Sequence, residues 1–302
     1  MVRGTGRVSE GGGTPRVLIH AGTHKTGTTS LQALFTQHRK TLRERGILYP
    51  LTGVLPNGTG IDSQTNIAWE LMGHNSFDPA VGILDELIAE VASSGCEKVL
   101  LSSEEFARLF DKPARLLRLK AAFEDAGFAP HIGLVFRDMV ECADTLFVTL
   151  LAHGLELSHE EFSRRAAEEG KVTIKGNSYC FDRAVITRAF VVEVFGESAV
   201  TCIEYDRKDA VSPFLEAFDW FFEGALDDAD TGVRANTIMD GAERLRASIR
   251  AGEARIASLG AEIERLQAEV EWLTARLAAS KHRLWLRLER RLRSILAARR
   301  TG

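Results

Sequence analysis

A short segment rich in glycine and hydroxyl residues, HAGTHKTGTTSLQ at positions 20–32, carries groups that bind phosphate. It follows an apolar run, RVLIHAG, and precedes a segment with helical spacing. A glycine-containing turn between a strand and a helix presents backbone N–H groups at the helix N-terminus, where phosphate oxygens bind. The residues that we expect to hold a phosphate are His24, Lys25, Thr26, Gly27, Thr28, Thr29 and Ser30.

This segment departs from the Walker A pattern, in which a lysine directly follows the second glycine. Gly22 and Gly27 have the required spacing, but Thr28 occupies the lysine position. The cation comes instead from Lys25, two residues before Gly27. The pattern therefore disfavours an ordinary ATPase or kinase. Serine and threonine at a helix start also cap helices, which is the alternative explanation for the hydroxyls.

A second candidate anion site lies in GLVFRDMVECADT, residues 133–145. Arg137 follows a buried strand, and Thr145 comes eight positions later. The guanidinium fork suits a doubly charged phosphate. The alternative is that Arg137 forms a salt bridge with Asp138 or with a neighbour at the start of the next helix.

The loop, the stretch RKTLRERGILYP at 39–50 and the Arg137–Thr145 pair resemble bacterial sulfotransferases that use 3′-phosphoadenosine 5′-phosphosulfate (PAPS). The resemblance covers roughly residues 16–240. It implies that the loop binds the 5′-phosphosulfate, that Arg137 and Thr145 bind the 3′-phosphate, and that no metal is needed. The family usually has serine where Thr145 stands. The GxxGxxK segment of cytosolic members is absent, and Arg234 is the expected substitute.

Sulfuryl transfer needs a cation at the leaving oxygen and a base for the acceptor. Lys25 is our candidate for the first role. The resemblance places a His or Glu after the strand that precedes the arginine strand, and here Glu104 and Glu105 follow KVLLSS. We expect Glu104 to be the base, with Glu105, His20 and His24 as alternatives. Both glutamates also suit the start of a helix, where acids are favoured.

The elements that must position these residues alternate along the chain, which predicts an α/β fold with helices on both faces of a parallel sheet. We expect a P-loop-like three-layer domain with a central parallel sheet, followed by a long C-terminal coiled-coil helix. The expected strands are 16–22, 98–103, 131–137 and 199–206. The expected helical segments are 30–46, 79–94, 104–126, 138–153, 158–169 and 180–195, with a loop at 50–66.

The predicted domains are a disordered leader at 1–15, the α/β domain at 16–240, a coiled-coil helix at 241–280 and a basic amphipathic tail at 281–302. Apolar residues spaced 4,3,4,3 over 245–277 predict a homo-oligomer, or else a long helix packed on its own domain. The tail carries a charge of +7 on a chain of net charge −4. Residues 281–300 suit an anionic membrane surface or a solvated coiled-coil end.

Composition sets further bounds. The chain has 302 residues, 45% hydrophobic and 26% charged, which excludes a disordered or collagen-like protein. The negative net charge argues against nucleic acid as a partner. Four cysteines without a CxxC pair predict reduced thiols in the cytoplasm, and no apolar stretch is long enough to predict a transmembrane helix.

The predicted function is transfer of a sulfuryl group from PAPS to a hydroxyl or amine acceptor. The resemblance implies a carbohydrate or glycolipid acceptor, and the loops at 50–80 and 154–180 are expected to form its pocket. The alternatives are a P-loop kinase using ATP and an inactive nucleotide-fold scaffold that acts through its coiled coil.

Overall fold

The computed structural model describes residues 14–23, 26–56, 60–152, 155–174, 176–227, 229 and 263–268. The chain divides into two units, residues 1–237 and 238–302. In the second unit, residues 263–268 are helical. Most of the predicted coiled coil, the basic tail, most of the leader, and His24, Lys25 and Arg234 lie outside the described residues.

The first unit contains a five-stranded parallel sheet with the strand order β2-β3-β1-β4-β7. Its strands are β1 (Arg16–Gly22), β2 (Ile47–Leu48), β3 (Lys98–Ser102), β4 (Ala129–Phe136) and β7 (Val200–Glu204). In β1, Val17 pairs with Val99 on one side and with Pro130 on the other. The chain is therefore an α/β protein with a central parallel sheet, as the alternation of elements predicts.

Helical segments connect these strands. The α-helices are α1 (Thr28–Gln37), α2 (Arg39–Glu44), α3 (Thr65–Met72), α4 (Leu84–Ser93), α5 (Pro113–Asp125), α6 (Met139–Ala152), α7 (His159–Glu169), α8 (Arg183–Phe190), α9 (Ser212–Ala217) and α10 (Asp219–Phe222). The 3₁₀ helices are η1 (Pro79–Val81), η2 (Glu104–Asp111) and η4 (Glu197–Ala199), and η3 (Val191–Phe195) is a π-helix.

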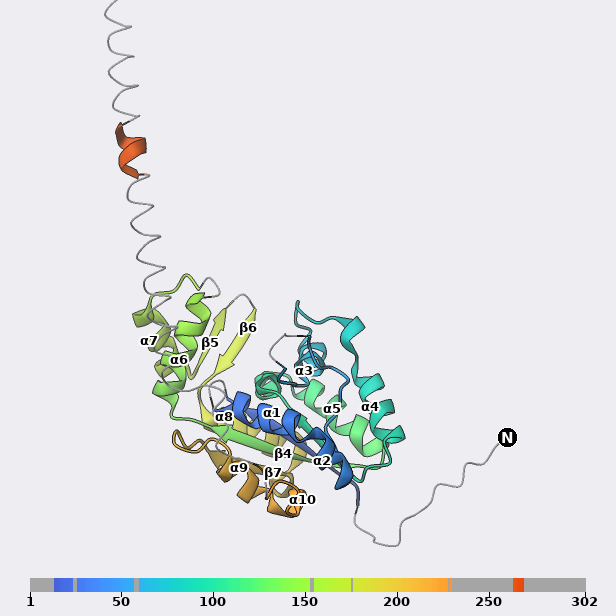
Figure 1. Ribbon diagram of the computed structural model, residues 1–302. Helices are drawn as coiled ribbons and strands as arrows, with labels where there is room; N and C mark the ends of the chain where they lie inside the picture. Colours follow the sequence, from blue (N-terminus) through green and yellow to red (C-terminus); the bar gives the residue numbers. More distant parts are fainter. Residues whose placement is uncertain are drawn as a thin grey trace, which may run out of the picture. The chain divides into compact units, whose positions relative to one another are not determined.

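Two hydrophobic clusters cover the two faces of the sheet (Figure 1). Alternate residues of β1 point to opposite faces, so Leu18 packs under α1, α2, α9 and α10, whereas Val17 and Ile19 pack under α3, α4, α5 and α8. Phe35 on α1 is fully buried, and burying such a side chain contributes roughly 1.5–3 kcal/mol. These clusters form the three layers of the domain and fix α1 against the sheet.

A third, separate hydrophobic cluster joins α6 and α7 to a two-stranded antiparallel hairpin, β5 (Lys171–Ile174) and β6 (Asn177–Cys180). Figure 1 shows these four elements together at one side of the sheet. The sequence analysis assigned no strand here. Its expected helix at 180–195 begins only at Arg183, because Asp182 caps α8 and Cys180 belongs to β6.

The segment expected to be helical at 104–126 consists of two helices of different kinds. Residues 104–111 form η2, and α5 begins at Pro113. A residue that precedes proline is pushed out of the α region, and Lys112 has φ −131° and ψ 60°. The region after residue 210, expected to be mixed, contains α9 and α10.

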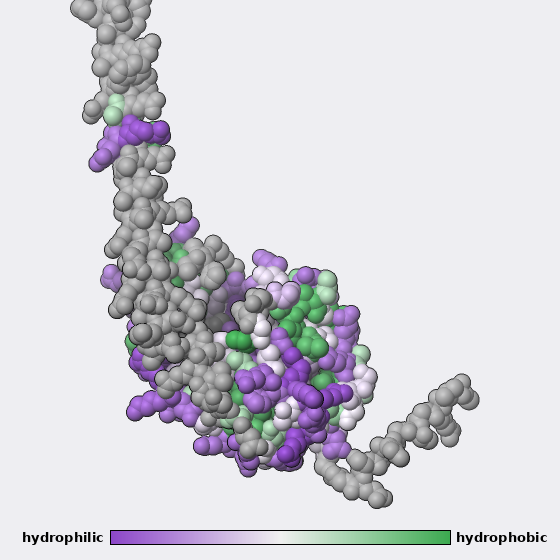
Figure 2. All heavy atoms as spheres, viewed as in Figure 1, coloured by the Kyte–Doolittle hydropathy of each residue, from purple (hydrophilic) through white to green (hydrophobic). Residues whose placement is uncertain are grey.

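Over the described ranges, every helix is too short or too polar to cross a bilayer. The outer surface over α1 and α2 is largely hydrophilic (Figure 2). Residues such as Lys40 and Glu44, an exposed ion pair one helical turn apart, contribute to this surface.

Candidate nucleotide and transfer site

The strand order creates a crevice at the carboxyl end of the sheet. β1 lies between β3 and β4, the helix after β1 packs on one face, and η2 and α5 after β3 pack on the other. Connections that diverge to opposite faces leave a crevice between the strand ends, and open α/β sheets bind ligands there. A small hollow at this point is lined by Gly22 and Thr23 from the end of β1 and by Glu104 from the start of η2.

The loop between β1 and α1 is closely packed. Thr26 is fully buried, and its hydroxyl donates to the carbonyl of Thr23 at 2.7 Å. A Cβ added at Gly22 would lie 2.5 Å from that hydroxyl oxygen. Gly27 has φ +72°, and a Cβ added there would lie 2.4 Å from Cβ of Ala210. Both glycines are therefore required by space, and Gly27 also by its backbone conformation.

The start of α1 presents backbone and hydroxyl groups together. Gly27 occupies the N-cap position and offers no capping side chain. The first N–H groups of an α-helix have no partner within the helix. Thr28 and Ser30 are buried and Thr29 is half-buried, so the three hydroxyl residues surround these N–H groups at a shielded helix end.

One aromatic ring connects the loop with Arg137. Tyr205 follows β7, and its ring carbon would lie 3.1 Å from a Cβ at Gly27. The guanidinium carbon of Arg137 lies over the same ring, 5.3 Å from its centroid. The side chain of Arg137 is 14% exposed. The two predicted phosphate elements are thus brought to the same edge of the sheet, with Tyr205 in contact with both.

Arg137 is held by a residue of α6, the helix that follows it. Its Nε and Nη2 donate to Oε2 of Glu141, at 3.0 and 2.8 Å. Asp138 instead caps α6, accepting from the N–H groups of Val140 and Glu141. The sequence alternative of a salt bridge near the helix start is therefore present, with Glu141 rather than Asp138 as the partner.

Thr145 lies two helical turns after Arg137. Its hydroxyl donates to the carbonyl of Glu141 at 2.6 Å. Glu141 and Thr145 are four positions apart in α6 and therefore share one face of the helix. Arg137 precedes α6 and bonds to Glu141, so the three side chains form one connected polar line. The eight-residue spacing between Arg137 and Thr145 therefore allows both side chains to bond to Glu141, which lies midway between them.

The two candidate bases point to different partners. Side chains three apart in a 3₁₀ helix are aligned, so Glu105 forms an ion pair with Arg108 at 2.5 Å. Burial raises the pKa of Glu105, and Arg108 opposes that rise. Glu104 turns to the other side, where its Oε2 accepts from the amide of Gln32 at 3.4 Å. Of the two, Glu104 is the residue that lines the hollow with Gly22 and Thr23.

His20 and Cys142 lie beneath and beside the loop as neutral groups. The Nδ1 of His20 is 2.8 Å from the hydroxyl of Ser102, and burial lowers the pKa of His20 to about 3. Burial raises the pKa of Cys142 to about 11, although Arg137 and a hydrogen bond with Thr23 oppose the rise. At neutral pH the imidazole of His20 is uncharged and Cys142 is a thiol.

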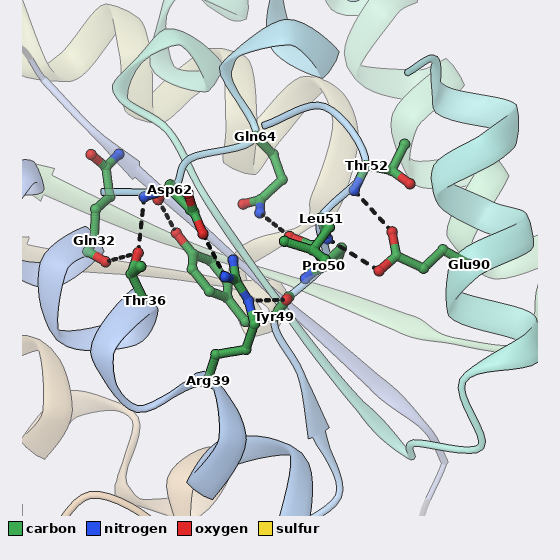
Figure 3. Close-up of polar contacts among 10 residues, drawn as sticks. All are labelled: Gln32, Thr36, Arg39, Tyr49, Pro50, Leu51, Thr52, Asp62, Gln64 and Glu90. Carbon is green, nitrogen blue, oxygen red and sulfur yellow. Dashed lines mark hydrogen bonds and ion pairs between the residues drawn. The ribbon is translucent and has the colours of Figure 1, made fainter. Parts of the chain in front are cut away.

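A polar network bonds to the backbone carbonyl of Gln32 (Figure 3). Thr36, one turn later on α1, donates its hydroxyl to the carbonyl of Gln32 and accepts from the N–H of Asp62, at 2.7 and 2.9 Å. The carboxylate of Asp62 forms an ion pair with the guanidinium of Arg39 at 2.5 Å. The backbone carbonyl of Asp62 accepts a hydrogen bond from the hydroxyl of Tyr49. The segment after β2 is thereby fastened to α1, which fixes the side chain that contacts Glu104.

The structure therefore brings together Thr26, Gly27, Thr28, Thr29, Ser30, Arg137 and Glu104 at one sheet edge, with Thr145 further along α6. Three residues that sequence reasoning missed belong to the same region: Tyr205, Gln32 and Arg108. Tyr205 had a usable signal, because it lies near the end of the strand predicted at 199–206. Within the described ranges, His, Cys, Asp and Glu side chains form no group of three that could hold a metal ion.

Comparisons with known proteins add little to this geometry. No family model and no curated protein matches the chain. Among solved structures, a sulfotransferase from Alicyclobacillus acidocaldarius matches with 20% identity and a TM-score of 0.40, over 82% of this chain and 96% of that one. A likeness at this level supports no argument about activity, so a function must be argued from the site.

Proposed function

We propose that this protein transfers a sulfuryl group from PAPS to a hydroxyl or amine acceptor, with a carbohydrate or glycolipid as the acceptor class. The observation that carries the proposal is the contact of Tyr205 with both Gly27 and Arg137. This contact supports the proposal that the start of α1 and Arg137 bind the two phosphates of one nucleotide. PAPS carries phosphates at its 5′ and 3′ positions and needs two such sites, whereas ATP lacks the 3′-phosphate.

The proposed reaction is an in-line displacement. Glu104 takes the proton of the acceptor, the acceptor oxygen or nitrogen bonds to sulfur, and the bond from sulfur to the bridging oxygen breaks. The electron pair stays on that oxygen, which leaves adenosine 3′,5′-bisphosphate. N–H groups at the start of α1, with Thr28, Thr29 and Ser30, hold the 5′-phosphate, and catalysis comes from positioning and charge stabilisation. Lys25 is assigned to the leaving oxygen and Arg234 to a phosphate on sequence grounds alone.

Calorimetric titration with adenosine 3′,5′-bisphosphate and with ATP·Mg²⁺ tests the donor assignment. We expect the bisphosphate to bind more tightly than ATP. In Arg137→Ala its affinity should fall by about 2–4 kcal/mol, roughly 30- to 1,000-fold, because a buried charge pair is lost. Arg16→Ala is the matched control, since Arg16 also lies over an aromatic ring, Trp220, but at the opposite end of the strands. This control should bind like the wild type.

Two results would overturn the assignment. Tighter binding of ATP·Mg²⁺, unchanged by Arg137→Ala, would indicate a kinase. Binding of neither nucleotide would favour a scaffold that acts through its coiled coil.

We further propose that residues 245–277 join copies of the chain and that residues 281–300 contact an anionic membrane surface, in a protein of the cytoplasm. Both proposals rest on the sequence pattern. Sedimentation of the full chain, compared with a chain ending near residue 243, tests the first. Flotation with anionic and neutral vesicles tests the second.

A further inference from the structure

A cavity of about 400 Å³ lies beside the proposed transfer site. Its walls come from the end of α3, from η2 and from the hairpin strand β6. The volume falls within the ~300–1,000 Å³ typical of small-molecule sites. The wall residues from 72–75 and 176–178 belong to the two stretches, 50–80 and 154–180, that the sequence analysis expected to contact the acceptor.

Arg108 forms one wall of this cavity, and its charge is compensated. Only 7% of its side chain is exposed. Its Nη1 lies 2.5 Å from Glu105, its Nη2 donates to Oδ1 of Asn177 at 2.7 Å, and its guanidinium lies over the ring of Tyr179 at 4.7 Å. Because Glu105 neutralises Arg108 at close range, this wall offers no unpaired cation to an anionic ligand.

The remaining polar walls are also balanced in charge. Asp111 and Lys112 bring one negative and one positive group. Burial and the nearby Arg108 lower the pKa of His74, so its imidazole is uncharged at neutral pH. Asn75, Asn177 and Ser178 add amide and hydroxyl groups, which both donate and accept hydrogen bonds. The cavity therefore combines several hydrogen-bonding groups with apolar surface, and the charges of its described lining residues are balanced.

The cavity and the transfer site share a wall. Arg108 also lines the smaller hollow that contains Gly22, Thr23 and Glu104. A 3₁₀ helix rises about 2 Å per residue, so Glu104 and Arg108 lie about 8 Å apart along η2. A ligand of one or two rings in the cavity can therefore extend a group toward Glu104.

From this geometry we propose that the cavity binds an uncharged, hydroxyl-rich acceptor and directs one of its hydroxyls to Glu104. The proposal rests on the proposed function, and it narrows the acceptor from a carbohydrate or glycolipid of any charge to a neutral polyhydroxylated compound. A hydroxyl both donates and accepts a hydrogen bond, as do the groups around it. An anion or an ammonium group would meet Asp111 and Lys112, two side chains of opposite charge, beside the compensated Arg108, so neither sign of charge is favoured in the cavity.

Saturation-transfer NMR on the full chain, with adenosine 3′,5′-bisphosphate present, tests the proposal. The probes are the methyl glycosides of glucose, galactose and N-acetylglucosamine, with methyl glucuronide as the anionic counterpart and phenol as the apolar one. We expect at least one neutral glycoside to bind, and we expect the glucuronide and phenol to compete poorly with it. Asn75→Trp should weaken this binding at least tenfold, because the indole fills the cavity.

Ser76→Trp is the matched control, since Ser76 is the next residue in the same turn but lies outside the cavity walls. It should bind the glycoside like the wild type. Asn75→Leu provides a second variant of near-native size, which loses the amide and should weaken binding several-fold. Nucleotide affinity should be unchanged in all three variants.

The inference is overturned if no neutral glycoside binds, if the glucuronide or phenol binds more tightly, or if Asn75→Trp and Asn75→Leu leave glycoside binding intact. Failure of the proposed function is a separate result. It would appear as loss of preference for the bisphosphate over ATP in the wild type, whatever the glycosides do.

Discussion

The loop after β1 and the segment after β4 reach the same sheet edge but differ in how they are built. In the loop, Thr26 is buried with its hydroxyl bonded to Thr23, and Gly27 fits against Ala210 with no room for a side chain. In the segment after β4, Arg137 is bonded to a half-exposed glutamate, Glu141. The described part of the first region is closely packed, and the second region has a charge already engaged.

Under the proposed function, this difference gives two ways of binding a phosphate. The loop can act through backbone groups fixed before the ligand arrives, which saves the entropy of ordering them. To bind a phosphate, Arg137 must either share its guanidinium between the phosphate and Glu141 or break its hydrogen bonds to Glu141. The loop is therefore expected to be intolerant of substitution, whereas substitutions around Arg137 are expected to raise or lower the affinity for the nucleotide.

The largest expected effect is that of Gly27→Ala. A non-glycine residue in the left-handed region costs roughly 1–2 kcal/mol, and forcing a methyl group into a packed site costs about 1–3 kcal/mol more. We expect the free energy of unfolding to fall by about 2–5 kcal/mol and bisphosphate affinity to fall at least ~100-fold, since the loop must move. Denaturant unfolding and calorimetry measure the two quantities.

The control is Gly46→Ala. Gly46 has φ +75°, close to that of Gly27, but nothing lies within 4 Å of its added Cβ. It should lose only the backbone contribution and bind nucleotide normally. Equal effects of the two substitutions would show that the loop is not closely packed against Ala210.

A second expected effect concerns the neutral group beneath the loop. The pKa of His20 in the folded protein, about 3, lies below the ordinary histidine value of 6.5 because the side chain is buried. The unfolded chain then binds a proton that the folded chain does not, so stability falls as pH drops from about 6.5 toward 3. The slope from this group is up to ~1.4 kcal/mol per pH unit. Unfolding of the wild type should show this slope between pH 6 and 4, and His20→Asn should lack it. Parallel pH curves for the two proteins would mean that His20 is accessible to solvent protons.

The smallest expected effect is a gain. Glu141→Gln removes the competing carboxylate from Arg137, and an ion pair of this exposure is worth about 0.2–1 kcal/mol. Bisphosphate affinity should rise by up to ~5-fold, measured by calorimetry at low salt. Glu44→Gln, which breaks the exposed Lys40–Glu44 pair on α2, should leave it unchanged. A fall in affinity on Glu141→Gln would instead give Glu141 a supporting role in orienting Arg137.

The sheet could be read from the sequence because its strands are apolar runs next to glycine-rich or charged turns. β1, β3, β4 and β7 were all predicted within about two residues of their bounds. The hairpin β5–β6 was missed because its strands have only four residues each and mix polar with apolar side chains. Such short strands gain their stability from the packing on α6 and α7, which the sequence alone does not show.

The site was predictable as a set of residue types but not as a set of contacts. Arg137 and the loop could each be found from the strand before them. The contact of Tyr205 with both, and the opposite directions of Glu104 and Glu105, depend on strand order and on the 3₁₀ geometry of η2. Helical periodicity predicts a face over many residues and does not separate two adjacent side chains in a short 3₁₀ segment.

The hairpin β5–β6 has its own hydrophobic cluster, apart from the two that cover the sheet. Apart from Cys180, which also packs against the cluster over one face of β1, its residues can therefore be exchanged without changing what packs on β1. Under the proposed function, the hairpin that lines the acceptor cavity and the sheet that holds PAPS can therefore change independently of each other. In proteins with this architecture, substitutions of a few residues around Asn177 and Ser178 can then change the acceptor, while the residues of the nucleotide site stay the same.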